Sequence, residues 1–276
     1  MNLVVVTAST DPERAKPCIR SWGGMSFVGV VNGRPCTPQP KPEGEAEGEL
    51  VRSWLLSPEY LGTVPAFRLG VDYALEHTDA EIIACFHDDV EILDPEWQQK
   101  VTRLFERHPA CGLAGFSGAI GLGDADLYTT PYNPMHLARI GFRSNLVDAE
   151  VHGIRSLLSE QVAVADGFSQ IGRREFFEGL RRDSGREGDK PWTLMEDLGV
   201  RHHCYDAMLG CCAKRLGWET WYLPISCRHY GGQTAVGDRE YQAWAKKQVP
   251  GGDQGFWQAA HKICYDTFND VLPLRV

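Results

Sequence analysis

Residues 81–89 read Glu-Ile-Ile-Ala-Cys-Phe-His-Asp-Asp, in which an apolar run passes directly into three polar side chains. A short run rich in β-branched and aromatic residues is typical of a strand buried in a parallel sheet. Adjacent carboxylates are unfavourable inside a protein core, so we expect Asp88 and Asp89 just beyond the carboxyl end of that strand. There they suit a hard divalent cation held beside a phosphate. A plain turn or a helix cap also often carries Asp-Asp, and these residues alone leave that interpretation open.

The chain around this strand alternates between strand and helix patterns. Short β-branched runs end in polar loops, and apolar residues at helical spacing follow them. We expect strands over 3–6, 27–31 and 81–86, and helices over 11–22, 63–77 and 94–105. This alternation predicts a three-layer α/β/α fold with a mostly parallel, Rossmann-like central sheet. Ligands bind at the carboxyl edge of such sheets, and the loops expected there are 7–9, 32–33 and 87–89.

The second half of the chain has a less regular pattern. We expect long loops over 115–153, and the Pro-, Gly- and Glu-rich composition of 34–49 predicts another exposed loop. The mixed charges of residues 172–190 predict a solvated helix followed by a mobile loop. Further expected elements are a strand over Gln161–Asp166, a helix over Tyr205–Leu216 ended by Gly217, a strand over 220–223, and one or two helices after about residue 237.

Composition limits the class of protein. The 276 residues include 28 Lys and Arg against 37 Asp and Glu, a formal charge of −9, and 43% are hydrophobic. This balance is ordinary for a globular protein, and it disfavours broad binding of nucleic-acid backbones, which needs a cationic surface. The nine cysteines contain no Cys-x-x-Cys pair, so we interpret them as reduced thiols in a cytoplasmic protein. We expect no signal peptide and no transmembrane segment, because no apolar run is long enough.

Two residues of the second half have side chains suited to a catalytic or metal site. Asp206 stands in the first turn of an expected helix, and His229 is followed by Tyr230 and a pair of glycines that permit close backbone approach. Each also has a structural interpretation, as a carboxylate favoured by the helix dipole and as a hydrogen-bonded histidine. A zinc site is a further alternative, although its candidate ligands follow no zinc spacing. These candidates are His202, His203, Cys204, Cys211 and Cys212.

Taken in order, these signals resemble family 2 glycosyltransferases and their GT-A relatives over about residues 1–235. The family has a nucleotide-binding first strand, a helix with an Ala-Arg-Asn-x-Gly-like motif, and a strand that ends in Asp-x-Asp or Asp-Asp. An Asp-Gly segment with a following Arg-Arg/Arg-Glu-x-Phe, an acid that opens a helix, and a His near glycines come later. The similar elements here are Leu3–Ser9, Ala66-Phe67-Arg68-Leu69-Gly70, Ile82–Asp89, Asp166-Gly167 with Arg174-Glu175-Phe176-Phe177, Tyr205-Asp206 and His229.

The resemblance implies a GT-A-like fold and a metal-dependent enzyme that transfers a sugar from a nucleotide-diphosphate sugar to an acceptor hydroxyl, with inversion. It implies Asp206 as the general base, and Asp89 with His229 as ligands of Mn²⁺ or Mg²⁺. It also implies that Asp166 and Gly167 bind the acceptor. The residues implied in donor binding are Thr7, Ala8, Ser9, Asn32, Arg68 and Asp88.

The chain departs from the family pattern at three places. Phe67 and Arg68 stand where the family has Arg and Asn, and Asn32 stands where the family usually has an acid that grips the base. An amide both donates and accepts, so uracil, thymine and guanine are compatible with Asn32, and a UDP-sugar is the favoured donor. The metal motif is His-Asp-Asp and lacks the first acid of Asp-x-Asp. This leaves Asp89 as the direct ligand and Asp88 as a contact to ribose or to metal-bound water.

We expect one catalytic domain over 1–276, with a nucleotide-sugar-binding half over 1–110, an acceptor-binding half over 111–235 and a helical tail over 236–276. The expected acceptor is a glycan, a lipid-linked sugar or a small molecule. One alternative is a catalytically inactive GT-A-like binding or scaffold protein. Another is a glycosyltransferase acting on a modified base in DNA, supported only by the arginines within 173–186. A nucleotidyltransferase is disfavoured, because the first loop lacks the Gly-rich, basic sequence of that class.

Overall fold

The computed structural model describes residues 1–33, 52–123, 139–147, 153–181, 196, 199–231 and 239–276. Its centre is an eight-stranded sheet in which β3, β2, β1 and β4 are parallel neighbours. β11 lies antiparallel between β4 and β6, β12 runs parallel to β6, and β9 closes the sheet antiparallel to β12. In sheet order the strands are β3 (Arg52–Ser57), β2 (Phe27–Asn32), β1 (Leu3–Ser9), β4 (Ile82–His87), β11 (Ser169–Arg173), β6 (Cys111–Gly115), β12 (Glu219–Tyr222) and β9 (Glu160–Val162).

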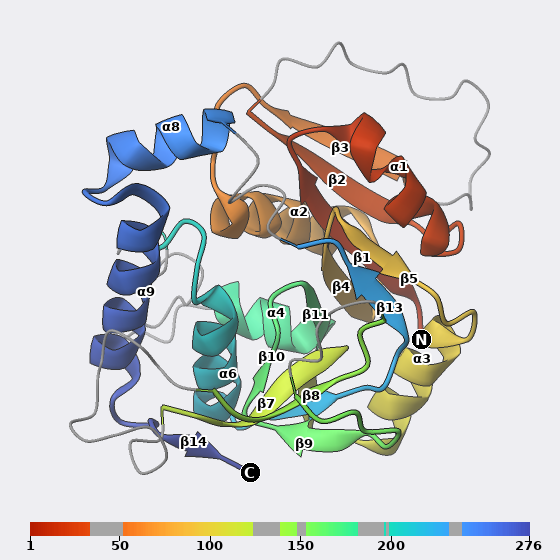
Figure 1. Cartoon of the computed structure of the whole chain (residues 1–276). Coiled ribbons are helices and arrows are strands. Elements are labelled where there is room, and N and C mark those ends of the chain that lie inside the picture. The colour runs from red at the N-terminus through yellow and green to blue at the C-terminus, as the bar shows by residue number, and fades with distance from the viewer. Residues whose placement is uncertain (34–51, 124–138, 148–152, 182–195, 197–198, 232–238) are drawn as a thin grey trace, which may run out of the picture.

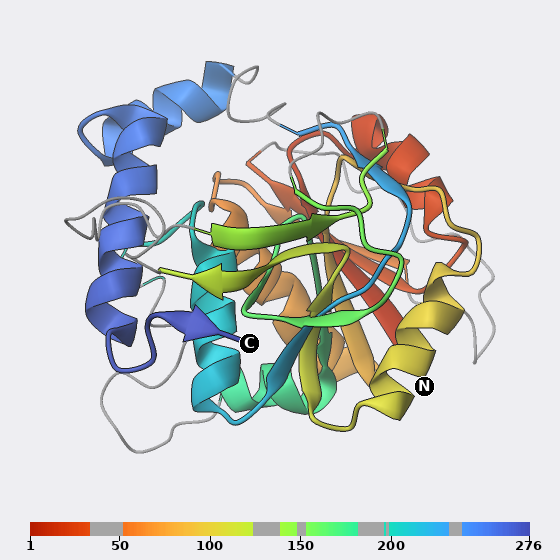
Figure 2. The same ribbon diagram turned by 60° about the horizontal axis from the view of Figure 1, so that its bottom comes forward.

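Helices cover both faces of this sheet because the side chains of its central strands alternate between two cores. On β1, Val4 and Val6 join one core and Val5 joins the other. The first core packs against α2 (Thr63–His77), α4 (Arg174–Arg181) and α6 (Tyr205–Arg215), and the second against α1 (Pro12–Ser21) and α3 (Trp97–Arg107) (Figure 2). The result is a three-layer α/β/α arrangement around a mixed, mostly parallel sheet, as the sequence predicts.

Two smaller sheets attach distant segments to the carboxyl edge of the central sheet. β7 (Ser117–Leu122) pairs with β8 (Arg139–Ser144), β10 (Val164–Ala165) and β14 (Leu274–Arg275). β5 (Val90–Ile92) pairs antiparallel with β13 (Cys227–His229), so that His229 stands opposite Val90. This pairing carries a histidine from late in the chain to the turn that follows β4 (Figure 1).

The C-terminal part of the chain adds two helices to one side of the molecule. α8 (Arg239–Gln248) packs its Tyr241 against Tyr60, and α9 (Gly252–Phe268) lies beside α6 (Figure 1). Ala260 and Cys264 of α9 enter the same core as α6, so α9 is part of the folded body. In the part of the chain that the structure describes, every helix is too short or too polar to cross a bilayer.

The strand and helix predictions for residues 1–110 are confirmed, apart from their ends. The helix expected over 94–105 begins at Trp97, because the Asp94 carboxylate accepts the backbone N–H of Glu96 within the preceding turn. The helix that starts at Tyr205 is confirmed, and Gly217 follows it with φ +78°. The expected helices after residue 237 are also confirmed.

Several predictions for irregular structure were wrong. Within 115–153, residues of β7 and β8 form strands, although glycines gave β7 the composition of a loop. Gly118 is needed there, because a Cβ would stand 2.5 Å from the Val164 carbonyl oxygen. The single strand expected over Gln161–Asp166 is two short strands in different sheets, β9 and β10.

Three strands of the central sheet were not predicted, namely β3, β6 and β11. β3 follows directly on the loop-like composition of 34–49. β11 carries Ser169 and Gln170 at buried positions, which hides its strand character. Both side chains have partners inside the protein, since Ser169 Oγ accepts the Phe116 N–H and the Gln170 amide N–H donates to the Ala165 carbonyl. The predicted loop over 34–49 and the expected mobile residues from 182 to 190 lie outside the described residues.

Candidate functional site

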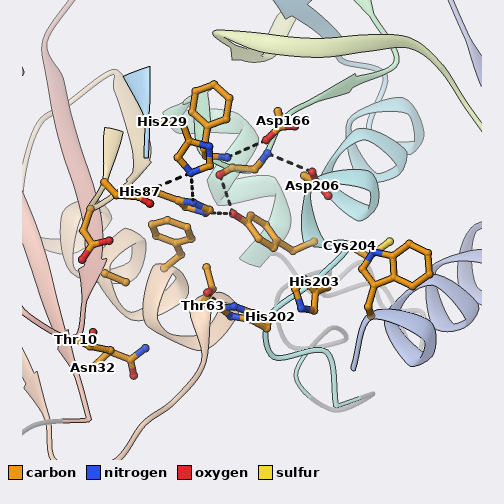
Figure 3. A pocket seen from close by; sticks show the side chains of 18 of the residues that line it. Thr10, Asn32, Thr63, His87, Asp166, His202, His203, Cys204, Asp206 and His229 are labelled. Carbon is orange, nitrogen blue, oxygen red and sulfur yellow. Dashed lines mark hydrogen bonds and ion pairs between the residues drawn. The ribbon is translucent and has the colours of Figure 1, made fainter. Parts of the chain in front are cut away.

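The structure brings the polar turns of the carboxyl edge into one cavity of about 310 Å³ (Figure 3). Its walls come from the ends of β1, β2 and β4, the turn between β10 and β11, the N-terminus of α6, and α9. Five acidic and imidazole side chains that the sequence assigned to the donor, the acceptor, the metal or the base line it, namely Asp88, Asp89, Asp166, Asp206 and His229. Other lining residues are Ala8, Thr10, Asn32, Tyr60, His87, Arg139, Gly167, His202, His203, Tyr205, Trp257 and His261.

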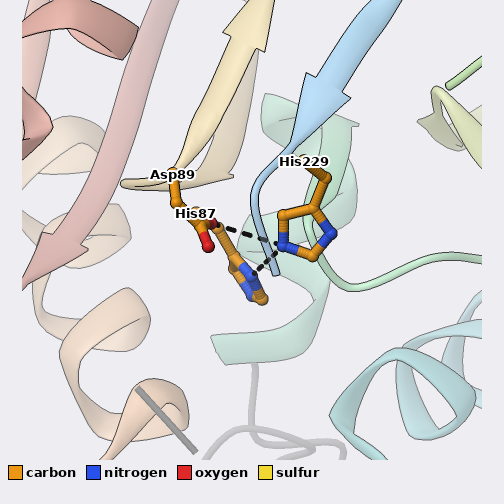
Figure 4. Close-up of side chains that lie close together, drawn as sticks. All are labelled: His87, Asp89 and His229. Carbon is orange, nitrogen blue, oxygen red and sulfur yellow. Dashed lines mark hydrogen bonds and ion pairs between the residues drawn. The ribbon is translucent and has the colours of Figure 1, made fainter. Parts of the chain in front are cut away.

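At the centre of the cavity lies a His–Asp–His triad made of His87, Asp89 and His229 (Figure 4). One ligand atom from each residue lies within 4.8 Å of the other two. His229 Nε2 is 3.3 Å from Asp89 Oδ1 and 3.4 Å from His87 Nδ1. Among the described residues no other group of His, Cys, Asp or Glu meets this spacing, and the zinc site considered from His202 to Cys212 is therefore wrong.

The surroundings of the triad set its charge. Burial lowers the pKa of His87 to about 4, and the neighbouring His229 acts in the same direction, so His87 is neutral at pH 7. Burial alone would raise the pKa of Asp89, but the hydrogen bond and charge of His229 outweigh it and hold that pKa below its usual value. A neutral imidazole and an ionised carboxylate are the forms that bind metal ions.

Asp88 lines the same cavity, outside the triad and next to β1. Its Oδ2 accepts a 2.5 Å hydrogen bond from Ser9, and Arg14 lies 3.9 Å away. Burial raises the pKa of Asp88 to about 6, and the negative charge of Asp89 contributes to this shift. Ser9 therefore supports Asp88 from behind the cavity wall.

A second cluster at the far wall consists of Arg139, Asp166 and Asp206, and we call it the acid–arginine cluster. Arg139 lies 2.5 Å from Asp206 Oδ2 and 3.3 Å from Asp166 Oδ2. The same Asp206 oxygen accepts the Gly167 N–H at 3.2 Å, and its other oxygen accepts the Ala207 N–H at 2.8 Å. Burial raises the pKa of Asp166, although the positive charge of Arg139 opposes this.

Only some of the residues predicted to bind the nucleotide-sugar face the cavity with free polar atoms. Asn32 lines the cavity, but its amide accepts the Leu61 N–H at 2.7 Å and donates to the Gly62 carbonyl at 3.3 Å. Its side chain thus holds the loop before α2. Thr7 is buried and donates to the Phe86 carbonyl, so it ties β1 to β4 behind the cavity.

Arg68 does not reach the cavity. It pairs with Glu196 at 2.6 Å on the outer side of α2, although the helix motif suggested a phosphate contact. Gly167 lines the cavity, but the space where its Cβ would stand is filled by Tyr205, whose hydroxyl oxygen lies 2.6 Å from that position. The group that approaches Gly167 closely is therefore the Tyr205 side chain, whereas the sequence suggested an acceptor there.

A third wall, rich in histidine, comes from the segment before α6 and from α9. His203 lies 2.6 Å from Asp253 of α9, and His202 forms a 2.7 Å hydrogen bond with Thr63. Trp257 packs on His261 with ring centres 4.2 Å apart. The sequence suggested His202 and His203 only as zinc candidates. It did not select Asp253, Trp257 or His261, because the chain after residue 237 carries no recognised motif.

His87 and Arg139 are the other side chains that the sequence did not assign. His87 was read only as part of the motif His-Asp-Asp. A signal was present, since it occupies the position of the first acid in Asp-x-Asp. Arg139 follows residues whose pattern suggested a loop, and only the pairing of β8 with β7 turns it toward the two acids.

No family model matches this chain, and no curated protein matches it in sequence. Solved structures are similar in fold. The crystal structure of GalNAc-T7 with UDP, GalNAc and Mn²⁺ superposes with a TM-score of 0.51 at 10% identity, over 83% of this chain and 43% of that one. The mannosyltransferase PcManGT from Pyrobaculum calidifontis, in complex with GDP-Man and Mn²⁺, gives 0.47 at 13% identity over 96% and 69%.

The likeness to GalNAc-T7 shows that the fold is GT-A-like, which confirms the predicted fold class. This chain spans less than half the length of the GalNAc-T7 chain. At 10% identity the likeness does not assign an activity to individual residues, and their roles are argued below from the geometry alone.

Proposed function

We propose that this protein is a metal-dependent glycosyltransferase that moves a sugar from a nucleotide-diphosphate sugar to an acceptor hydroxyl, with inversion. One observation carries the proposal. The His–Asp–His triad and the acids at positions 166 and 206 face the same cavity, at the carboxyl edge of a GT-A-like sheet. A diphosphate leaving group and an acceptor would therefore meet between a cation site and a carboxylate.

The side chains of the triad fit a divalent metal ion. Two imidazole nitrogens and one carboxylate oxygen leave positions open for phosphate oxygens and water, and mixed nitrogen and oxygen donors favour Mn²⁺ over Mg²⁺. When bound, such an ion offsets the negative charge that grows on the diphosphate as the sugar leaves. Asp88, supported by Ser9 and partly neutralised by Arg14, is placed to receive the ribose or a water beside the ion.

The general base is proposed to be Asp206, with Asp166 as the competing candidate. A base must accept the proton of the acceptor hydroxyl within hydrogen-bond reach. Asp206 is the deeper of the two, with 8% of its side chain exposed, and it accepts hydrogen bonds from Arg139 and two backbone N–H groups. Asp166 is 25% exposed, and its contact with Arg139 is longer. For Asp206 to act, the acceptor must take the place of Arg139 beside one of its oxygens.

The acceptor is proposed to lie between the acid–arginine cluster and the histidine-rich wall. Trp257 supplies an aromatic face of the kind that packs against a sugar ring, and His203 and His261 supply polar edges. A glycan, a lipid-linked sugar and a small molecule all fit this description. A modified base in DNA is the less favoured acceptor, because the net charge of the chain is −9.

The test is a thermal-shift panel of UDP-, GDP- and dTDP-sugars with and without Mn²⁺, followed by product analysis with the donor that stabilises the protein. A UDP-sugar is the first donor to test. We expect a shift that needs both donor and metal, and release of nucleoside diphosphate. Binding without any release or transfer would favour the inactive binding protein. If no nucleotide-sugar raises the melting temperature, the proposed function is wrong.

A further inference from the structure

The hydrogen bonds of Tyr205 determine which nitrogen of His87 carries the proton. The Tyr205 hydroxyl lies 2.7 Å from the Gly167 carbonyl oxygen and 2.7 Å from His87 Nε2. A carbonyl oxygen only accepts, so the single hydroxyl proton of Tyr205 is donated to Gly167. The hydroxyl oxygen must then accept from His87, and Nε2 carries the proton. In a neutral imidazole this leaves Nδ1 as a bare lone pair.

That lone pair points into the triad. His87 Nδ1 is the atom that lies 3.4 Å from His229 Nε2, on the side of the ring that faces Asp89 (Figure 4). From this geometry we propose that Tyr205 is a positioning residue, which fixes His87 in the Nε2–H form so that Nδ1 is a ligand of the metal ion. The inference rests on the metal site of the proposed function and goes beyond it, because it gives His87 and Tyr205 defined roles in that site.

The surroundings hold this arrangement in place. Tyr205 is 5% exposed, and the ring of Phe67 is stacked on His87 at 6.1 Å with an angle of 19° between the planes. The Tyr205 hydroxyl occupies the space that a side chain at position 167 would need, since a Cβ there would be 2.6 Å away. Gly167 is thus required for the hydroxyl to reach both of its partners. Groups that orient a metal-bound histidine in this way commonly change metal affinity by about 10–100-fold.

The backbone of one residue, Gly167, links the two sides of the cavity. The Gly167 carbonyl accepts from Tyr205, while the Gly167 N–H donates to Asp206. Tyr205 and Asp206 are consecutive residues in the first turn of α6. The orientation of the metal ligand His87 and that of the proposed base therefore depend on one backbone unit.

The experiment compares Tyr205→Phe with Tyr222→Phe in Mn²⁺ titrations followed by electron paramagnetic resonance, with no nucleotide or acceptor present. Tyr222 is a matched control: it is fully buried and donates one hydrogen bond to the Ser156 carbonyl, on the β12 side of the sheet. We expect Tyr205→Phe to weaken Mn²⁺ binding about 10–100-fold and Tyr222→Phe to leave it unchanged. Pulsed spectra of bound Mn²⁺ should show two nitrogen ligands in the native protein and one in Tyr205→Phe, as in His87→Asn.

Two further measurements keep the inference testable if Tyr205→Phe folds poorly. In the metal-free native protein, the ¹⁵N spectrum of His87 should show protonation at Nε2, and protonation at Nδ1 would overturn the proposal. Gly167→Ala should weaken Mn²⁺ binding as Tyr205→Phe does, while Gly179→Ala, where the nearest atom is 3.5 Å away, should not. If Tyr205→Phe binds Mn²⁺ with native affinity and keeps two nitrogen ligands, the proposed role of Tyr205 is refuted but the metal site is not. A native protein that binds no Mn²⁺ would refute the metal site as well.

Discussion

The two polar clusters of the cavity differ in how their side chains are satisfied. In the His–Asp–His triad, the Nδ1 lone pair of His87 and the carboxylate of Asp89 converge on His229 at 3.3–3.4 Å. In the acid–arginine cluster, Asp206 accepts hydrogen bonds from Arg139, Gly167 and Ala207. The His–Asp–His triad therefore places acceptor atoms around a small space. In the acid–arginine cluster, protein donors already occupy the carboxylate oxygens of Asp206.

The difference indicates which protein contacts each substrate group has to displace when it binds. A cation can enter the triad by replacing little more than the proton shared around His229. A ligand at the acid–arginine cluster has to compete with Arg139 for a carboxylate oxygen. Metal and donor binding should thus depend on the triad and not on the acid–arginine cluster, whereas transfer should depend on both clusters. The predictions below separate these two requirements.

The largest effect is expected from Asp89→Ala, which removes the only carboxylate of the triad. Mn²⁺-dependent binding of the nucleotide-sugar should be abolished, as measured by calorimetry with and without the metal. Glu91→Gln is the control, because it removes a carboxylate two residues away that pairs with Arg228 instead. Retention of metal-dependent binding in Asp89→Ala would remove Asp89 from the metal site.

A large loss of transfer with intact donor binding is expected from Asp206→Asn. An amide cannot take the proton of the acceptor, so the rate of transfer should fall on the order of 10³-fold, while the donor affinity stays within a few fold. Single-turnover rates and donor titrations measure the two quantities. The paired variant Asp166→Asn should lose much less. If the order is reversed, Asp166 is the base and Asp206 holds the Gly167 turn.

The comparison also predicts an effect on stability. Arg139→Gln leaves two carboxylates near each other without their cation, which should lower the free energy of unfolding by about 3 kcal/mol. Arg143→Gln, on the same strand, leaves a single carboxylate, Glu160, which is 33% exposed against 8% for Asp206 and can be solvated, so it should lower the free energy of unfolding by about 1 kcal/mol. Urea unfolding of both variants measures the difference. If both variants lose the same free energy of unfolding, Arg139 does not stabilise the two carboxylates more than Arg143 stabilises Glu160.

The smallest effect is expected outside both clusters, at Asp253 of α9. Burial would raise the pKa of Asp253, but hydrogen bonds from Tyr241 and His203 outweigh it and hold that pKa below its usual value. A carboxylate with a lowered folded pKa stabilises the protein above its unfolded pKa of about 4, and this contribution disappears as the pH falls through the folded value.

Melting temperatures of the native protein and Asp253→Asn between pH 3 and 7 test this linkage. The native protein should be the more stable at pH 7, by about 1 kcal/mol or less, since Asp253 is partly exposed. The difference should shrink toward pH 3. A difference that is constant over this range would mean that the ionisation of Asp253 does not contribute.

Local sequence patterns are enough to predict the regular half of the molecule and the positions of its acids along the chain. Strands over β1, β2 and β4 follow from short β-branched runs, and the helices between them follow from apolar spacing, because each depends on residues close together in the chain. The same holds for Asp88 and Asp89 beyond β4 and for Asp206 in the first turn of α6. In each case the neighbouring residues are enough to specify the backbone.

Which of these residues meet depends on long-range strand pairing and helix packing. His229 reaches His87 across 142 residues because β13 pairs with β5, and Tyr205 reaches Gly167 across 38 because α6 packs behind the turn after β10. Arg139 lies between two acids, and Arg68 lies with Glu196 outside the cavity. Local patterns do not encode such contacts, because strand pairing and helix packing depend on the burial of the whole chain. The internal strand β11 escaped prediction for the same reason, since its polar side chains find their partners only in the folded core.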